Sequence, residues 1–338
     1  SLLALRAGAA RVLGVDHSPH LARCAQRVLA EHADKVTVVC GDIRTISLEE
    51  EERFDVVVAE LLDAGGLGEK IVPFMRHAKS RLVKPGARLV PRGLRVRAAL
   101  VEATLAVDGV DLSAFEAFWL PARASQGEWL GIDLDAGCSW MPSSDPVEVF
   151  RLNFEGSQAD LIESLQEQEL RFRLRLPRCN ALAWWFEADL GISEEGACDL
   201  TSAPSCFRPP HCGATHWVQA LAGLGPYSFP AHASALKVRV RTDGVNITWT
   251  PSAVETSDGV EALPETPVEN KAVSAWREQA AEASRKIQDL ENSLDRIGDV
   301  ARLQALQAAA LAIAAQPGLF GLEVTPDVVA RLLKGLFV

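Results

Sequence analysis

The stretch FDVVVAELLDAGGLGE, residues 54–69, joins an apolar run to a glycine-rich bend. The run FDVVV is apolar enough to be a buried strand of the kind found in parallel sheets. Glu60 then stands where this strand ends, and Glu69 follows nine residues later, beyond three glycines. Two carboxylates on either side of a flexible bend predict a functional site, whose chemistry the rest of the chain has to supply.

The segments around this stretch alternate between strand and helix patterns over the first ninety or so residues. Short apolar runs that end in acids occupy residues 11–16 and 35–42. Residues 18–33 start with Ser-Pro, which suits the N-cap and first turn of a helix, and continue with apolar residues at helical spacing. Residues 71–86 indicate a helix that Pro85-Gly86 stops, and a further strand follows. This alternation predicts an α/β domain with a parallel sheet covered on both faces.

From about residue 94 the pattern changes to alternating strands without long helices between them. The expected strands lie at 94–103, 148–154, 170–176, 181–190 and 235–251. Asp243-Gly244 is a typical hairpin turn within the last of these segments. We expect antiparallel strands that close into a barrel or sandwich.

The last third of the chain begins with a polar, Pro/Ser/Glu-rich segment at 251–269, which predicts a linker. Apolar residues then recur at alternating spacings of three and four from Val273 to Ile297, which indicates a heptad seam. A helical extension over 270–338 is therefore expected. Packing of these helices on their own domain and a coiled-coil dimer are both consistent with the pattern.

The composition narrows the function classes. The 338 residues are 48% hydrophobic and 23% charged, with a formal net charge of −11, which argues against nucleic-acid binding. We find no apolar run long enough for a membrane span and no signal-peptide pattern. Seven cysteines without a C-x-x-C pair favour reduced thiols in the cytoplasm or nucleus.

A zinc site is an alternative interpretation of one cysteine-rich region. Cys198, Cys206 and Cys212 lie near His211 and His216 in the sequence. Their spacing fits none of the common zinc patterns, so ordinary buried thiols are favoured and no metal is expected.

Acidic residues end three successive expected strands: Asp16, Asp42 and Glu60. In open parallel sheets, ligands bind beyond the carboxyl ends of the strands. An acid at such a position can accept hydrogen bonds from a ribose diol. The acid at the end of the next strand can bind an adenine amino group. Three acids in register suggest a cofactor that contains a nucleoside. NAD is disfavoured because no G-x-G-x-x-G motif precedes the first helix.

The sequence resembles the protein arginine methyltransferases over roughly residues 1–250. SLLALRAGAARVLGVD looks like the helix and strand after that family's glycine-rich cofactor loop, and AELLDAGGLGE is similar to its double-glutamate loop. LVKPGARLVPRG looks like the strand that closes the cofactor domain, and Thr215-His216-Trp217 matches the loop beside the substrate arginine. ALAWWFEADL and HWVQAL are most similar to the branch with tandem modules and monomethylating enzymes.

The resemblance implies a role for each matching position. Asp16 would bind the ribose of S-adenosylmethionine with His17 beside the adenine, and Asp42 with the backbone of Ile43 would hold the adenine edge. Glu60 and Glu69 would clamp the guanidinium of an arginine in a protein substrate, with His216 as a further catalytic residue. The channel for the substrate arginine would be lined by His216, Trp217 and Thr215.

Elementary chemistry supports a carboxylate pair for this task. Guanidinium is planar, permanently charged and presents a fork of donors that carboxylates match bidentately. Two carboxylates can orient it and draw its charge away from the nitrogen to be methylated. Positioning and electrostatics would then supply most of the rate enhancement.

The predicted organisation follows from these patterns. A partial, Rossmann-like cofactor domain occupies 1–93, a β-barrel substrate domain 94–250, a linker 251–269 and a helical extension 270–338. The glycine-rich loop and the preceding tyrosine-bearing helices of the family have no counterpart here, since the single tyrosine is Tyr227. We therefore expect an N-terminally truncated chain that is inactive alone.

The assembly of the chain and its activity remain open at this point. The resemblance implies a homodimer or pseudo-dimer built through an arm within 104–145. A non-catalytic scaffold that uses its heptad segment for assembly is the principal alternative to an active enzyme. A methyltransferase of small molecules is disfavoured, because it would not need the guanidinium clamp.

Overall fold

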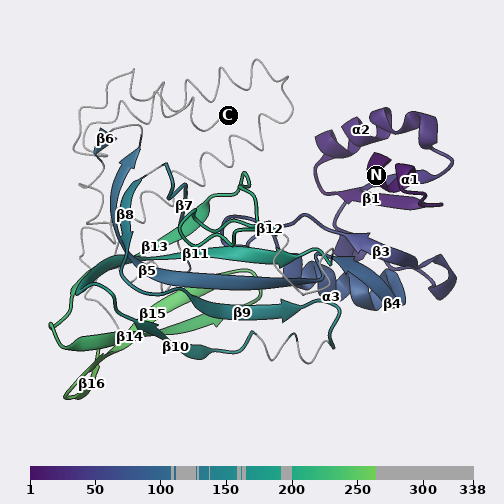
Figure 1. Cartoon of the computed structure of the whole chain (residues 1–338). Coiled ribbons are helices and arrows are strands. Elements are labelled where there is room, and N and C mark those ends of the chain that lie inside the picture. The colour runs from purple at the N-terminus through teal and green to yellow at the C-terminus, as the bar shows by residue number, and fades with distance from the viewer. Residues whose placement is uncertain are drawn as a thin grey trace, which may run out of the picture. The chain divides into compact units, whose positions relative to one another are not determined.

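The computed structural model describes residues 1–107, 110–111, 127, 129–136, 138–157, 161, 165–191 and 200–263 (Figure 1). The chain divides into two compact units, Ser1–Val268 and Glu269–Val338. The second unit lies outside the described residues, and with it the predicted helical extension and heptad seam.

The N-terminal segment is a parallel strand pair covered by a helix. Its elements are α1 (Leu2–Arg6), β1 (Val12–Asp16), α2 (Pro19–Val28), the short 3-10 helix η1 (Ala30–His32) and β2 (Val36–Cys40). β1 pairs with β2 from Val12↔Val36 to Asp16↔Cys40. Ser18 caps α2 as predicted, since its hydroxyl accepts the amide of Leu21 at 3.4 Å and Pro19 opens the helix.

A second parallel pair follows. Its elements are η2 (Ile43–Thr45), η3 (Glu50–Glu52), β3 (Phe54–Val58), α3 (Ile71–Arg81) and β4 (Val83–Val90). α3 ends at Arg81, so the predicted helix over 71–86 is too long. Pro85 and Gly86 lie inside β4, where the register with β3 shifts and Gly86 takes a φ of +77°. The shift accommodates residues that neither a regular strand nor a helix would accept.

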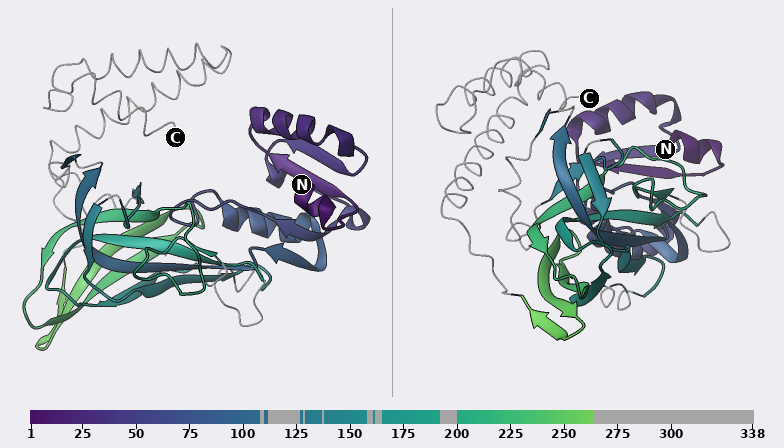
Figure 2. Two further views of the ribbon diagram at one scale, coloured as in Figure 1. Left: turned by 45° about the horizontal axis from the view of Figure 1, so that its top comes forward. Right: turned by 60° about the vertical axis from the view of Figure 1, so that its left-hand side comes forward.

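The described parallel strands form two separate pairs, β1–β2 and β3–β4, rather than the one sheet that the sequence predicts. Figure 2 shows α2 lying over the first pair and α3 beside the second. Arg11 connects the two pairs, because its guanidinium stacks over the ring of Phe54 at 4.3 Å.

The remaining described strands form the antiparallel domain. They are β5 (Gly93–Val107), β6 (Val110–Asp111), β7 (Leu130–Ile132), β8 (Cys138–Pro142), β9 (Val147–Asn153), β10 (Gln168–Arg173), β11 (Arg178–Asp189), β12 (Leu200–Thr201), β13 (Gln219–Ser228), β14 (Ala233–Thr242), β15 (Ile247–Thr256) and β16 (Gly259–Ala262). One sheet has the order β6-β5-β11-β13-β7, with β8 and β9 on β5 and β12 on β11. The other has the order β10-β14-β15-β16. This curled pair of sheets confirms a barrel-like antiparallel domain.

Local turn chemistry holds the β14–β15 hairpin as predicted. Asp243 Oδ1 accepts the amides of Val245 at 2.8 Å and Asn246 at 2.7 Å, and Gly244 has a φ of +87°.

The linker predicted over 251–269 is wrong in its first part. Residues 251–256 continue β15, and β16 adds a further strand up to Ala262. Pro251 is accommodated beside a register shift between Lys237 and Val238 on β14, a place where proline is tolerated in a sheet.

The buried core of the antiparallel domain includes two tryptophans, one from each sheet. Trp184 on β11 packs against Trp249 on β15, with ring centroids 5.3 Å apart, so the two sheets are joined face to face. Lys79 of α3 donates to the backbone carbonyls of Phe154, Glu155 and Gly156 after β9. These bonds tie the helix that follows the double-glutamate loop to the antiparallel domain.

Among the described helices, none combines the length and apolar character that a membrane span requires.

Candidate active site

The double-glutamate loop, residues 59–70, connects β3 to α3. Ala59 is buried and its amide donates to the carbonyl of Val90 at 2.8 Å, which extends the β3–β4 pairing by one residue. Glu60 and Glu69 are both exposed at the two ends of the loop, as the sequence predicts for a strand-end acid and a returning acid.

The glycines of this loop make close contacts. A Cβ at Gly65 would lie 3.2 Å from the indole nitrogen of Trp184, and one at Gly66 would lie 3.0 Å from Cβ of Phe186. Both glycines and Leu67 are buried, and Gly66 has a φ of +87°. The bend is therefore packed against the antiparallel domain, whereas the sequence suggested a flexible turn.

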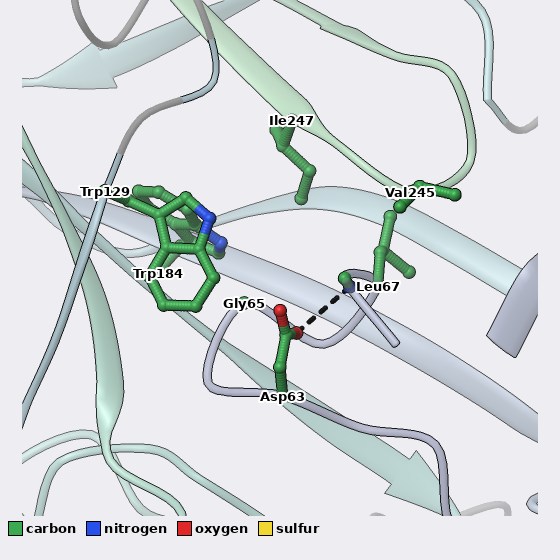
Figure 3. A pocket seen from close by; sticks show the side chains of 8 residues that line it. Asp63, Gly65, Leu67, Trp129, Trp184, Val245 and Ile247 are labelled. Carbon is green, nitrogen blue, oxygen red and sulfur yellow. Dashed lines mark hydrogen bonds between the residues drawn. The ribbon is translucent and has the colours of Figure 1, made fainter. Parts of the chain in front are cut away.

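Asp63 braces the inside of the loop. Its Oδ1 accepts the amide of Gly68 at 3.1 Å (Figure 3). Its backbone carbonyl accepts the amide of Gly66 at 2.9 Å. Burial raises the pKa of Asp63, while the backbone amides of the loop act in the opposite direction. Asp63 was not singled out from the sequence. A carboxylate followed by two glycines is a signal for such a turn.

A small pocket lies beneath the loop, lined by Asp63, Gly65, Leu67, Gly68, Trp129, Trp184, Val245 and Ile247. Figure 3 shows the carboxylate of Asp63 on one side and the indole rings on the other. Trp129 meets Trp184 edge to face, with centroids 6.0 Å apart. The loop therefore rests on aromatic side chains that belong to the antiparallel domain.

The segment Thr215-His216-Trp217 reaches the same loop. The indole nitrogen of Trp217 donates to the backbone carbonyl of Leu62 at 2.7 Å. Its ring lies edge to face on Phe186 at 5.4 Å and 3.9 Å from the ring of His216, which is itself exposed. The structure thus brings Trp217 of the predicted motif to the loop that carries the two glutamates, through a hydrogen bond to the loop backbone.

Thr215 holds the start of this segment. Its hydroxyl donates to the carbonyl of Thr201 at 3.1 Å, which anchors the segment to the end of β12. The resemblance assigns Thr215 to the substrate channel, and the contact seen here is with the protein's own backbone.

Electrostatics link the acids of the site. Burial raises the pKa of Glu69 above its ordinary value, and the nearby charges of Glu60 and Asp63 raise it further, while His17 opposes them. The charges of Glu60, Asp63 and His17 therefore act on Glu69 through space. A cation that enters between the glutamates would relieve this repulsion.

The strand-end acids of the first parallel pair lie as predicted at the carboxyl ends of β1 and β2. Asp16 is half-buried and its Oδ1 accepts the amide of Ser18 at 2.8 Å, while His17 is exposed. Asp42 caps η2 and binds the guanidinium of Arg44 at 2.5 Å, which holds the pKa of Asp42 well below its ordinary range. Ile43 follows in the first turn of η2 and is half-buried.

The described part of the chain contains no group of three or more His, Cys, Asp or Glu side chains arranged to hold a metal ion. Cys206 is a free thiol and Cys212 is buried, and Cys198 of the alternative zinc interpretation lies outside the described residues.

The chain is similar to known methyltransferases in sequence. A family model described as Methyltransferase domain matches residues 1–86. Protein arginine N-methyltransferase 7 of Drosophila melanogaster is 27% identical over 227 residues, which cover 62% of this chain and 32% of the relative. Arginine N(omega)-methyltransferase of Streptomyces achromogenes subsp. streptozoticus is 26% identical over 234 residues, which cover 65% of this chain and 58% of the relative. The chain thus spans about a third of the length of the fruit-fly relative.

Two solved structures share the fold. The Trypanosoma brucei PRMT1 enzyme-prozyme heterotetrameric complex with AdoHcy superimposes with a TM-score of 0.55 at 18% identity, covering 78% of this chain and 82% of that one. Arabidopsis thaliana protein arginine methyltransferase 10 gives a TM-score of 0.55 at 18% identity, covering 76% and 82%. The chain is thus similar in sequence to protein arginine methyltransferases and shares the fold of two of their solved structures.

Proposed function

We propose that the whole protein transfers a methyl group from S-adenosylmethionine to guanidinium nitrogens of arginine in protein substrates. The observation that carries this proposal is the Trp217–Leu62 hydrogen bond. It joins the segment from the antiparallel domain to the loop whose two ends carry Glu60 and Glu69.

The residues at the ends of β1 and β2 fit the cofactor. The half-buried carboxylate of Asp16 is suited to accept hydrogen bonds from two ribose hydroxyls, and His17 lies next to it in the chain. Asp42 and Ile43 would face the adenine edge, and the carboxylate of Asp42 also forms an ion pair with Arg44. S-adenosylmethionine supplies a methyl group that its sulfonium makes electrophilic, and the matched Methyltransferase domain over residues 1–86 includes all four positions.

Glu60 and Glu69 would act as a clamp for the guanidinium. Each carboxylate accepts a pair of N–H donors and keeps the planar group in a single orientation. Concentrating the positive charge on the held nitrogens leaves the remaining nitrogen more nucleophilic. A carboxylate of the clamp or His216 accepts the proton that this nitrogen loses. Thr215 and Trp217 border the channel through which the arginine side chain enters.

The same proposal extends to the organisation of the chain. We place the two parallel pairs in one Rossmann-like cofactor domain over residues 1–93, with the antiparallel domain from residue 94 binding the substrate. The relatives named protein arginine N-methyltransferase 7 favour the monomethylating branch with tandem modules. We assign the segment from residue 270 to a helical extension that forms a coiled coil.

Assembly and location are part of the proposal as well. The Trypanosoma brucei neighbour is a heterotetramer with a prozyme, which supports assembly of this chain with a second methyltransferase chain, either as a homodimer or as a pseudo-dimer. Residues 104–145 would form the arm. We expect a cytoplasmic or nuclear protein without direct nucleic-acid or membrane binding.

A methylation assay tests the proposed function. The whole protein is incubated with labelled S-adenosylmethionine and an arginine-glycine-rich protein, with the same substrate protein carrying lysine for arginine as the control. Label on the arginine substrate alone supports the proposal. No label on either protein would contradict the proposed function and favour the scaffold alternative. The relatives, which are named as methyltransferases, do not favour that alternative.

Free arginine is the second acceptor to include, because one relative is named for arginine itself. Both acceptors present the same guanidinium to the clamp. Label on free arginine but not on the protein substrate would identify a small-molecule methyltransferase instead.

A further inference from the structure

We propose that Asp63 is the positioning residue of the clamp: its carboxylate holds the loop closed and fixes Glu69 relative to Glu60, and it does not bind the substrate. The inference rests on the proposed function, because a clamp serves a purpose only if a guanidinium binds between the two glutamates. The bracing itself follows from the geometry of the loop.

The first argument is the set of hydrogen bonds that close the loop. Asp63 bonds to Gly68 through its side chain at 3.1 Å and to Gly66 through its carbonyl at 2.9 Å. The next bond, from the amide of Lys70 to the carbonyl of Leu67 at 2.9 Å, continues the turn into α3. Glu69 lies between Gly68 and Lys70, whose amides form two of these hydrogen bonds, so its backbone is fixed on both sides.

The second argument is the space left for the carboxylate. A Cβ at Gly68 would lie 1.9 Å from Oδ2 of Asp63, a distance that no side chain tolerates. Gly68 is thus required so that the carboxylate can approach the backbone this closely. The two residues form one unit, and each is needed for the other's position.

The third argument separates Asp63 from the clamp residues. Glu60 and Glu69 are exposed, whereas Asp63 lines the apolar pocket with Trp129, Trp184 and Ile247. An acid that lies under the loop and whose oxygen accepts a hydrogen bond from a backbone amide is poorly placed to bind a substrate cation. Its negative charge also raises the pKa of Glu69, which works against ionisation of the clamp. A hydrogen-bond acceptor, rather than a charge, is therefore what the loop requires.

Four variants test this inference: Asp63→Ala, Asp63→Asn, Gly68→Ala and the double variant Asp63→Ala/Gly68→Ala. Asparagine keeps an oxygen acceptor of the same shape and removes the charge. Alanine at position 68 pushes the carboxylate away without altering it. Asp34→Ala, at an exposed position, controls for the loss of an acid. The melting temperature of each variant confirms that it folds.

The first readout is amide hydrogen exchange over residues 59–70 without any ligand. Loss of one hydrogen bond that closes the loop should speed exchange about tenfold in Asp63→Ala and in Gly68→Ala. Asp63→Asn and Asp34→Ala should exchange like the wild type. Gly68→Ala should have no further effect in the Asp63→Ala background, because the clash is gone. Unchanged exchange in Asp63→Ala would overturn the proposal.

The second readout is the affinity for an arginine-glycine-rich peptide, measured by calorimetry. Asp63→Ala and Gly68→Ala should weaken binding about tenfold, and Asp63→Asn should restore it to within about threefold of the wild type. Equal loss in Asp63→Asn and Asp63→Ala, with normal exchange in Asp63→Asn, would show that the charge binds substrate and would overturn the inference. If the wild type itself binds no peptide, the proposed function fails, while the exchange data still decide whether Asp63 braces the loop.

Discussion

The double-glutamate loop and the ends of β1 and β2 both present acids, but they hold them in different ways. Glu60 and Glu69 belong to a loop that packs on Trp184 and Phe186 and accepts a hydrogen bond from Trp217, all more than a hundred residues away in sequence. Asp16 and Asp42, in contrast, form hydrogen bonds with residues two positions further along the chain.

This difference indicates how the two halves of the site are prepared. The proposed substrate side is organised by the antiparallel domain, so its geometry depends on tertiary packing. The proposed cofactor side is organised by local turns, so its acids would keep their positions even if that packing were disturbed. Substitutions on one side should therefore leave binding on the other side intact.

The largest effect is expected for Glu60→Gln. Removing one charge of the clamp should lower methyl transfer to an arginine substrate by about 100- to 1000-fold, the range observed when a key electrostatic contact in an active site is lost. Cofactor affinity should remain within about twofold, because Glu60 lies on the substrate side. Turnover is measured with labelled S-adenosylmethionine and cofactor affinity by calorimetry.

The matched control for this variant is Glu50→Gln, an exposed glutamate in η3. It carries the same change of charge and should retain full activity. Turnover in Glu60→Gln equal to that of Glu50→Gln would remove Glu60 from the clamp.

Asp16→Asn tests the proposed cofactor side of the site. The loss of a charged acceptor at the end of β1 should weaken S-adenosylmethionine binding about 30-fold, as expected for hydrogen bonds to charged groups. Affinity for an arginine peptide, measured without cofactor, should not change. If Asp16→Asn weakened peptide binding as strongly as cofactor binding, the two sides would not be independently organised.

Trp217→Phe tests whether the antiparallel domain holds the loop. Phenylalanine keeps the aromatic contact with Phe186 but loses the hydrogen bond to the carbonyl of Leu62. Turnover should therefore fall about fivefold, and the free energy of unfolding should fall by about 1 kcal/mol at most. Trp140→Phe is the control, since the Trp140 indole makes an equivalent bond to the carbonyl of Leu134 at 2.6 Å. It should cost similar stability without loss of turnover, and equal turnover loss in both would argue against a specific role for Trp217.

Much of this arrangement was predictable from the sequence where local chemistry decides. The strand-end positions of Asp16, Asp42 and Glu60, the Ser18 cap and the Asp243-Gly244 hairpin each depend on a few neighbouring residues. Strand patterns predicted most of the antiparallel domain for the same reason.

The features that were missed depend on distant contacts. The glycines of the loop suggested flexibility, because nothing in their neighbourhood shows that Trp184 and Phe186 lie against them. Pro85-Gly86 and Pro251 suggested breaks, whereas register shifts in the sheets accommodate both within strands. The role of Asp63 likewise becomes visible only when Gly68 is seen to approach its carboxylate.

The smallest expected effect concerns the stability of the clamp itself. The pKa of Glu69 is raised above its ordinary value in the folded protein by burial and by the charges of Glu60 and Asp63. Ionising Glu69 therefore costs the folded state stability, a cost that is absent below the unfolded pKa and develops as pH rises through the folded pKa. Glu69→Gln, which cannot ionise, should melt at a higher temperature than the wild type at neutral pH.

The size of this difference should be modest, because Glu69 is largely exposed and solvent screens its repulsion. Calorimetric melting from about pH 4 to about pH 8 should show the two curves converging at the acid end, with Glu31→Gln, at an exposed glutamate, following the wild type throughout. A Glu69→Gln variant that melts below the wild type at neutral pH would mean that Glu69 stabilises the free protein. In that case the repulsion between the glutamates would not be the strain that a bound guanidinium relieves.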